Sequence, residues 1–482
     1  MSQDMIAPRI DSRQAKLAGR AAEQIVADVI ELGWPVGQVL GSEAELLERY
    51  GVSRAVLREA VRLVEHQRVA RMRRGTGGGL VIDEPDIDAV IGPAIIYLLR
   101  VDATLDQIFD TLILLEELAA ELASERAGES DLALLRNTLE QEAAGEVPDY
   151  RLLHSHVAAL TANPVLELFV ETFSRVSNFY FADRAALPSS VVEEVCRAHD
   201  AIARAILTNN SGLARARMRR HLSAEADFIR KQPDTVQRLD PAVALAGSLG
   251  DKRGEALARQ LFTEIVRSGA TPGDFVGSES ALMEKYQASR AVVREAIRIL
   301  EYHQIALTRR GPGGGLFVAE PDSTALAEII AIYLRRRGVK LRHISDLRTG
   351  LELAVTERAG ERLRAAQPAD LETMAADLTQ SLRAESELGF ALAFSRGEDF
   401  HSVLGGLTGN PALQLLHRVT MRLGWQFFSQ LATKNPRVNA ISEPAAIEPA
   451  HRDITEALSA GDAELAVMRM RAHMTATASP PT

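Results

Sequence analysis

The chain has 482 residues, of which 46% are hydrophobic and 25% are charged, in the proportions of a globular protein that buries several cores. Its net charge of −10 argues against a protein coated in nucleic acid, and its single cysteine, Cys196, excludes an intramolecular disulfide and fits a reducing compartment. The N-terminus lacks an apolar signal segment, and the longest apolar run, residues 89–99, is too short for a membrane helix. We therefore expect a cytoplasmic protein with no membrane partner.

An internal repeat organises the sequence. Residues 22–86 align without a gap with residues 258–322, and about 30 of the 65 positions are identical. The best-preserved stretch, SRAVLREAVRL at 53–63, returns as SRAVVREAIRI at 289–299, and each copy ends in a glycine-rich turn. The repeat is too long for a solenoid unit, so it predicts a duplicated pair of domains.

The first copy has the order of elements of a winged helix-turn-helix. Residues 15–32 show helical periodicity, which ends at Gly33. Ser42 and Ser53 are suitable N-caps for two more helices, which a tight turn separates. The run VARMRR, a glycine turn and LVI then predict a β-hairpin, or wing.

Arginines gather on the third helix and the wing of each copy. Residues 53–74 hold seven arginines against two glutamates, and residues 289–310 hold five against two. A helix that presents arginines fits the DNA major groove, and a glycine wing lets the backbone approach the minor groove or the phosphates. The alternatives are a solvated helix face and a flexible turn; a phosphate loop is excluded because no Gly-Lys-Ser/Thr follows. The wing residues expected to reach DNA are Arg73, Arg74, Gly77, Arg309, Arg310 and Gly313.

The rest of the chain reads as helix after helix, in the same order in both halves. We predict a mainly α protein in which two winged helix-turn-helix domains, each with a small β-hairpin, alternate with two all-α bundles. The predicted segments are a polar tail (1–14), the first winged helix (15–85), the first bundle (86–231), a linker (232–250), the second winged helix (251–321) and the second bundle (322–478).

Three histidines recur in each bundle. The first stands nine residues before an Asn-Pro step, and the other two are 22 residues apart. Three inward-facing histidines from three helices predict a site for a divalent metal, zinc, nickel or manganese, in one or both bundles. The alternative is that each is a hydrogen-bonded core residue. The candidate ligands are His154, His199, His221, His401, His451 and His473.

The motifs YGVSRAVLREAVRLVEHQ with RRGTGGGLVI, and YQASRAVVREAIRILEYHQ with RRGPGGGLFV, resemble those of the GntR family of bacterial transcription regulators, in its FadR-like branch. The family often has an arginine after the glutamate of the second helix, where this chain has Ala44 and Ser280, so that role is not carried over. The residues that the resemblance implies as DNA contacts are Ser53, Arg54, Arg58, Ser289, Arg290 and Arg294.

The resemblance extends to the bundles, because FadR-like regulators carry a helical ligand-binding domain, the FCD domain, with such a histidine trio. The family usually adds an aspartate four residues before the first histidine, where this chain has Tyr150 and Gly397. The resemblance implies an effector with a carboxylate, which a metal and a cation would hold together. The residues that we expect to bind it are Arg348, for which the first bundle has Leu112, and the two asparagines of the Asn-Pro steps, Asn163 and Asn410. The alternative for Arg348 is an ordinary surface residue of its helix.

The sequence thus predicts a metabolite-responsive repressor with two DNA-reading arms on one chain. Its partners would be double-stranded DNA, with a pseudo-palindromic or asymmetric operator, and a small carboxylate; pairing of two chains stays open. The alternative is a metal-dependent enzyme that uses the histidine sets. No general base or nucleophile pair accompanies the histidines at a recognisable spacing, so no catalytic residue is assigned.

Overall fold

The computed structural model describes residues 12–73, 75, 78–84, 87–144, 150–177, 188–231, 253–309, 311, 313–321, 323–432 and 444–477. These residues form two compact units. One holds the residues up to Gly92 together with Glu328–Gly338, and the other holds the rest. The predicted linker, 232–250, and most of the predicted polar tail lie outside the described residues.

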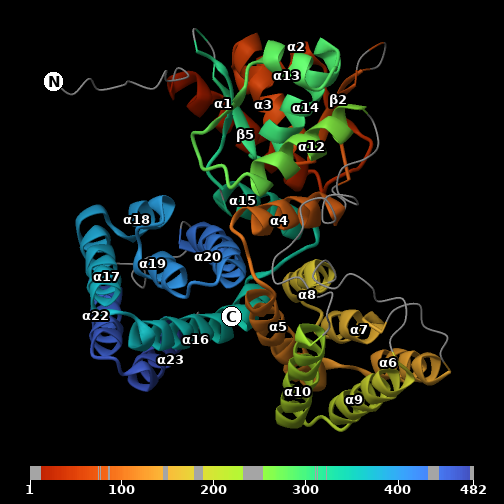
Figure 1. The fold of residues 1–482 in the computed structure, drawn as a ribbon, viewed down its shortest axis with the longest axis vertical. Helices are drawn as coiled ribbons and strands as arrows, with labels where there is room; N and C mark the ends of the chain where they lie inside the picture. Colours follow the sequence, from red (N-terminus) through yellow and green to blue (C-terminus); the bar gives the residue numbers. More distant parts are fainter. Residues whose placement is uncertain are drawn as a thin grey trace. The chain divides into compact units, whose positions relative to one another are not determined.

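The protein is mainly α, as the periodicity predicts, with two small antiparallel sheets (Figure 1). None of the described helices combines the length and the apolar character that a membrane span needs. The first winged helix consists of α1 (Ser12–Glu31), β1 (Val39–Gly41), α2 (Glu43–Tyr50), α3 (Arg54–His66), β2 (Ala70–Arg73) and β3 (Gly79–Ile82), with the strand order β1-β3-β2. The predicted hairpin is β2–β3, and the three-residue β1 is an addition that no sequence period revealed.

Local chemistry explains where α2 and α3 begin and end. The Ser42 hydroxyl accepts from Glu45 N, and the Glu45 carboxylate accepts from Ser42 N, which completes a capping box. Gly51 ends α2 in the left-handed conformation, with φ of 60°. Ser53 then caps α3 by accepting from Val56 N. These caps place a short turn between the two helices.

The second winged helix repeats this arrangement. It consists of α12 (Arg253–Arg267), β4 (Phe275–Gly277), α13 (Glu279–Lys285), α14 (Arg290–Tyr302), β5 (Ala306–Arg309) and β6 (Gly315–Val318), with the strand order β4-β6-β5. The last glycine of each wing lets the strand that contains it lie close to the first strand of the same sheet. A Cβ on Gly79 would lie 2.5 Å from the Gly41 carbonyl oxygen, and one on Gly315 would lie 2.7 Å from that of Gly277.

The two copies differ at the turn between their second and third helices. Where the first copy has Gly51, the second has Gln287 with φ of 49°, a conformation that costs a residue with a Cβ about 1 kcal/mol or more. We expect Gln287→Gly to stabilise the second winged helix by about 1 kcal/mol, measured as slower hydrogen exchange of the α13–α14 amides. Gly51→Gln is the matched control and should speed exchange in α2–α3; unchanged exchange in both variants would show that the turn stores no strain.

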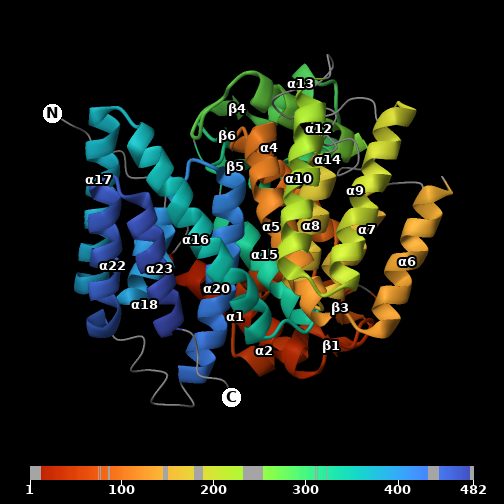
Figure 2. The same ribbon diagram turned by 90° about the horizontal axis from the view of Figure 1, so that it is seen from below.

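Each half continues into a helical bundle. The first bundle contains α5 (Leu105–Arg126), α6 (Glu129–Ala143), α7 (Leu152–Leu160), α8 (Pro164–Ser177), α9 (Ser189–Leu207) and α10 (Ser211–Arg230). The second contains α16 (Leu341–Ala365), α17 (Pro368–Leu388), α18 (Phe390–Arg396), α19 (Phe400–Leu407), α20 (Pro411–Ala432), α22 (Pro444–Ser459) and α23 (Ala463–Thr477). The first helix of each bundle, α5 or α16, packs against most of the others, and the last two helices lie side by side (Figure 2).

The two bundles contact each other through equivalent residues. Asn163 Nδ2 donates to the His343 carbonyl at 2.9 Å, and Asn410 Nδ2 donates to the Gln107 carbonyl at 2.9 Å. Gln107 and His343 occupy equivalent positions, 236 residues apart, on α5 and α16. An ion pair between Arg126 and Asp346, with N–O distances of 2.7 and 2.8 Å, also joins the bundles. The interface is therefore a pseudo-two-fold one within a single chain.

The helix that connects each winged helix to its bundle contacts the winged helix of the other half. Arg100, at the end of α4 (Asp88–Arg100), donates to the carbonyls of Gln304 and Ala319 in the second winged helix. Ile332, on α15 (Ser323–Arg336), is part of the buried core of the first winged helix, and Arg336 pairs with Glu84 at 2.5 Å. We call α4 and α15 the exchanged connecting helices, because each contacts the winged helix of the other half.

Candidate nucleic-acid interface and metal centres

Both third helices present two arginines around one glutamate. Arg54 and Arg58 lie 3.2 and 3.8 Å from Glu43 Oε1 through their Nε atoms, yet their side chains remain 70% and 69% exposed. In the second copy the equivalent arginines, Arg290 and Arg294, each lie 3.1 Å from Glu279. Exposed ion pairs contribute little to stability, so phosphate or guanine can replace the glutamate at small cost. The glutamate holds the guanidinium groups at the start of the helix.

The two predicted serines are the N-caps of these helices. Ser53 and Ser289 accept hydrogen bonds from Val56 N and Val292 N, both at 3.4 Å, and both serines are exposed. The first amide groups of a helix form an anion site, which is how a helix N-terminus binds a DNA phosphate. The structure therefore brings together the serine and the two arginines that the sequence predicts at each helix start.

The wings are described in part. Arg73 and Arg309 are exposed at the ends of β2 and β5, and the Arg309 guanidinium lies 4.2 Å from the centre of the Phe317 ring. Gly313 is exposed in the turn of the second wing. Arg74, Gly77 and Arg310 lie outside the described residues.

The three predicted histidines of the first bundle meet in its core. His154, His199 and His221 come from α7, α9 and α10 and are all buried. The Nε2 atom of His221 lies 3.2 Å from the Nε2 atoms of both His154 and His199. This spacing is close to that of two ligands on one ion with metal–nitrogen distances of about 2.0–2.1 Å.

Buried carboxylates orient the rings of the first cluster. Glu116, on α5, hydrogen-bonds to His154 Nδ1, and Glu142, on α6, accepts from His199 Nδ1 at 2.8 Å. A carboxylate on one ring nitrogen leaves the other nitrogen free to bind a metal. Burial, together with the neighbouring His154, lowers the pKa of His221 to about 3, so its ring is neutral and its lone pair is available. Burial opposes protonation of His154, but the adjacent Glu116 outweighs it and raises the His154 pKa.

The second bundle builds the same cluster from equivalent elements. His401, His451 and His473 come from α19, α22 and α23, are buried, and have ring nitrogens close enough to share one ion. His451 Nδ1 lies 2.8 Å from Glu385 on α17 and its Nε2 lies 3.3 Å from His473 Nε2. Burial, first of all, lowers the pKa values of both His451 and His473. Both clusters fit a divalent metal by their donor atoms and their convergence.

In neither cluster does an aspartate stand four residues before the first histidine, where the GntR family usually has one. Gly397 is the C-cap of α18, and the neighbouring Asp399 is the N-cap of α19, where its Oδ1 accepts from Ser402 N at 3.1 Å. In the first bundle Asp149 lies outside the described residues. Among the described residues, the donor set of each trio is three imidazoles, which leaves coordination positions for water or a ligand.

The three residues expected to bind the effector have different surroundings. Arg348, on α16, lies one turn before Glu352, and its Nε atom is buried without a hydrogen-bond partner among the described residues. Asn163 and Asn410 instead lie at the interface between the bundles. The Asn163 amide also accepts from Val165 N and Leu166 N, as that of Asn410 does from Ala412 N and Leu413 N. Their polar groups bind the protein itself, so the geometry gives no support for effector binding by the asparagines.

Sequence reasoning missed the four carboxylates of the clusters and one further histidine, His417. Glu116 and Glu352 stand at equivalent positions of α5 and α16, 236 residues apart, so comparing the two bundles position by position could have found this pair. Glu142 and Glu385 lie on helices whose sequences have diverged, where one sequence gives no sign of their role. The missed residues are Glu116, Glu142, Glu352, Glu385 and His417.

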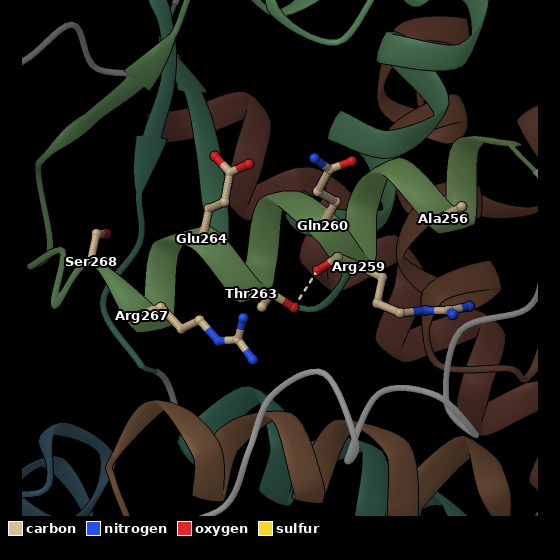
Figure 3. A pocket seen from close by; sticks show the side chains of 7 residues that line it. All are labelled: Ala256, Arg259, Gln260, Thr263, Glu264, Arg267 and Ser268. Carbon is tan, nitrogen blue, oxygen red and sulfur yellow. Dashed lines mark hydrogen bonds between the residues drawn. The ribbon is translucent and has the colours of Figure 1, made fainter.

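The surface also has an open hollow along α12, which lacks the features of a ligand site. It is lined by one face of that helix, and Figure 3 shows the side chains leaving the helix in different directions rather than converging. Thr263 Oγ1 donates to the Arg259 carbonyl at 2.8 Å, and Glu264 is paired with Lys285. The histidine clusters are the better candidates for the ligand chemistry.

Comparison with known proteins identifies both kinds of domain. The model of the bacterial regulatory proteins of the gntR family matches residues 17–79 and 253–318, and the FCD domain model matches residues 107–224 and 343–476. The two FCD matches together cover more than half of the chain.

Curated relatives correspond to about half of the chain each. The HTH-type transcriptional regulator LutR of Bacillus subtilis is 29% identical over 213 residues, 42% of this chain and 90% of that protein. The Exu regulon transcriptional regulator of Escherichia coli is 27% identical, over 42% of this chain and 82% of its own length. A solved structure, Streptococcus agalactiae GntR, is 21% identical over 44% of this chain and 99% of its own, with a TM-score of 0.32.

The matched domains and the named relatives are those of regulators, which excludes the alternative reading as a metal-dependent enzyme. The protein binds DNA through its winged helices and responds to a small molecule through its FCD domains. The chain belongs to the gntR family of bacterial regulatory proteins and carries both the DNA-binding domain and the FCD domain twice.

Proposed function

We propose that this regulator is a repressor whose two winged helices read the two halves of one operator and which a small carboxylate releases from DNA. The observation that supports it most is the duplicated arrangement of a serine-capped helix with two exposed arginines around one glutamate. The chromosome that such a bacterial regulator reads lies in the cytoplasm, where we place the protein.

The roles of the DNA-facing residues follow from their positions. The Ser53 and Ser289 helix starts bind phosphates, and the arginines of the first two turns pair with guanine edges in the major groove. These arginines are Arg54, Arg58, Arg290 and Arg294. The wing residues, Arg73, Arg74, Arg309 and Arg310 with Gly77 and Gly313, contact the backbone or the minor groove.

The operator is expected to be asymmetric or only pseudo-palindromic. Ordinary two-fold readers bind half-sites about one DNA turn, ~34–36 Å, apart. In this chain the two arms differ next to the arginines, at Leu57 against Val293, and at the turn, at Gly51 against Gln287. Unequal arms favour unequal half-sites.

The histidine clusters are the proposed metal sites, and the second is the proposed effector site. A divalent ion, zinc, nickel or manganese, would be held by His154, His199 and His221, or by His401, His451 and His473. When bound, it supplies an open Lewis-acid position for a carboxylate oxygen. Arg348 supplies the cation for the rest of the carboxylate in the second bundle, whereas Leu112 provides none in the first.

The exchanged connecting helices give the proposed route from ligand to DNA. Arg348 lies on α16, which follows α15 after a few residues, and α15 contributes Ile332 to the core of the first winged helix. A ligand that favours one position of α16 therefore biases the first DNA-reading arm. Because a ligand shifts an equilibrium only by its differential affinity, the effector must bind one arrangement of α15–α16 better than the other.

Selection of genomic DNA fragments by the purified chain, followed by footprinting at fixed salt, tests the proposal. We expect one recurring site with two unequal half-sites about a turn apart, and loss of the footprint when the right member of a panel of small carboxylic, hydroxy and keto acids is added. Protection of a single half-site, or binding that is blind to sequence, would contradict the two-arm reader. A footprint that every acid leaves unchanged would contradict the carboxylate effector alone.

Removal of metal is expected to destabilise the bundles. A ligand present at 100 times its Kd stabilises the folded state by about 2.7 kcal/mol, so stripping the protein with a chelator should lower its thermal midpoint by a few degrees. Adding back zinc should restore the midpoint in the wild type. His221→Ala combined with His401→Ala, which breaks every cluster that His401 joins, should melt at one temperature with or without zinc; a zinc response that survived in this variant would show that the ion binds elsewhere.

A further inference from the structure

The second bundle contains a cluster of ligand-type side chains beside its histidine trio. Glu352 Oε1, on α16, lies 3.0 Å from His401 Nδ1 and 3.2 Å from His417 Nε2. His417 comes from α20, and all three side chains are at most 2% exposed. The cluster thus joins three helices around one buried carboxylate.

The first bundle has no equivalent of His417. Counted from the Asn-Pro steps, which begin at Asn163 and Asn410, the position of His417 corresponds to Val170. The same alignment pairs Gly405, on α19, with Ala158 on α7. A Cβ on Gly405 would lie only 2.8 Å from His417 Nδ1. The second bundle therefore combines a large imidazole with a glycine that leaves room for it. The first bundle has a valine and an alanine at these two positions.

The geometry of the shared carboxylate also differs between the bundles. In the first, Glu116 forms a hydrogen bond with His154 Nδ1. In the second, the contacts of Glu352 lack hydrogen-bond alignment: among the described residues, neither its two oxygens nor His401 Nδ1 nor His417 Nε2 has a hydrogen-bond partner. Buried polar atoms that form no hydrogen bond have lost their hydration without full replacement, which destabilises the fold. A ligand that all of them could bind would remove that cost.

We propose that Glu352, His401 and His417 hold a second divalent transition-metal ion in the second bundle, through Oε1, Nδ1 and Nε2. Two imidazoles and one carboxylate on one side of an ion are a known donor set for such metals, with metal–nitrogen distances of about 2.0–2.1 Å. The atom separations of 3.0 and 3.2 Å are close to those of ligands that share one ion.

The new site shares one ring with the histidine trio. His401 belongs to both clusters, so when both are filled its two nitrogens each bind an ion, and the ring proton passes to solvent. Arg348, one turn before Glu352 on the same helix, adds a positive charge that opposes the second ion. The Glu352 site is therefore the weaker of the two and fills at higher metal concentration.

Counting metal ions tests the proposal. Full-length protein stripped of metal is titrated with zinc alone, and native mass spectrometry counts the ions per chain. We expect His417→Val, which installs the residue of the first bundle, to bind one zinc ion fewer than the wild type. Gly405→Ala, which forces the His417 ring to move, should lose the same ion. Equal counts in the wild type and both variants would overturn the proposal.

A second pair of variants separates the new site from the trio. His473→Ala breaks the trio but leaves Glu352, His401 and His417 in place, so adding His417→Val to it should still remove one ion. Thermal melting in metal-free buffer shows whether each variant is folded; should His417→Val fail to fold, Gly405→Ala decides the result. The zinc counts involve neither DNA nor effector. They can therefore contradict the second ion site while the proposed repressor function holds, and the repressor function can be wrong while the counts support the site.

Discussion

Alanine at both Arg54 and Arg58 is expected to weaken operator binding by roughly 100-fold, because an arginine that pairs with guanine contributes ~1–3 kcal/mol of specific affinity. Both side chains are exposed, so the fold should not change. Titration of labelled operator at fixed salt measures the loss. Binding to unrelated DNA should fall much less, since it depends on phosphate charge.

The equivalent change in the second arm, Arg290 and Arg294 to alanine, should also weaken binding, but by a different factor because the arms are not identical. Arg204→Ala is the control, since Arg204 is exposed and paired with Asp200 on a bundle helix, and it should leave the affinity unchanged. If only one of the two double variants lost affinity, the operator would be read by a single arm. If neither did, the helices would not be the reading elements.

Leucine at position 348 is expected to abolish the response to the carboxylate effector. The change removes a guanidinium whose Nε is buried and installs the residue that the first bundle has at this position. Truncating one partner of a desolvated charge pair costs about 2–5 kcal/mol, so the carboxylate that releases the wild type should bind at least about 30-fold more weakly. Isothermal titration with that acid and the footprint assay measure the two effects.

Two controls make this result specific. Arg364→Leu changes an exposed arginine of the same helix and should leave the effector response intact. DNA binding without effector should stay as in the wild type for Arg348→Leu. A variant that loses DNA binding as well would place Arg348 among the residues that hold the fold. A variant that still responds to the acid would move the effector site away from the second histidine cluster.

The winged helices could be predicted from the sequence because their signals are local. Ser53 caps the helix whose arginines follow it, and the glycines of the wing lie between the two strands that they join. The three-residue strand β1 could not be predicted, because it is defined by pairing with β3, about forty residues later in the chain. Its only trace is the close approach that requires glycine at Gly79.

In the bundles, the repeated spacing predicted which histidines meet but not what surrounds them. The carboxylate partners lie 38 to 66 residues away, on helices whose sequences give no sign of which face turns toward the histidines. The asparagines show the converse difficulty. Asn163 and Asn410 recur because each caps a helix and binds the opposite bundle, roles that a recurrence in one sequence cannot distinguish from ligand binding.

The pairing of the bundles within one chain has a consequence for how such a regulator evolves and works at low copy number. In a homodimer every substitution appears on both sides of the two-fold axis, so a change that suits one pocket is forced on the other. Here Leu112 and Arg348 can differ, although they occupy equivalent positions on α5 and α16. Because Arg126 meets Asp346 inside the same molecule, dilution does not separate the halves, and a cell with a few molecules keeps every one of them assembled.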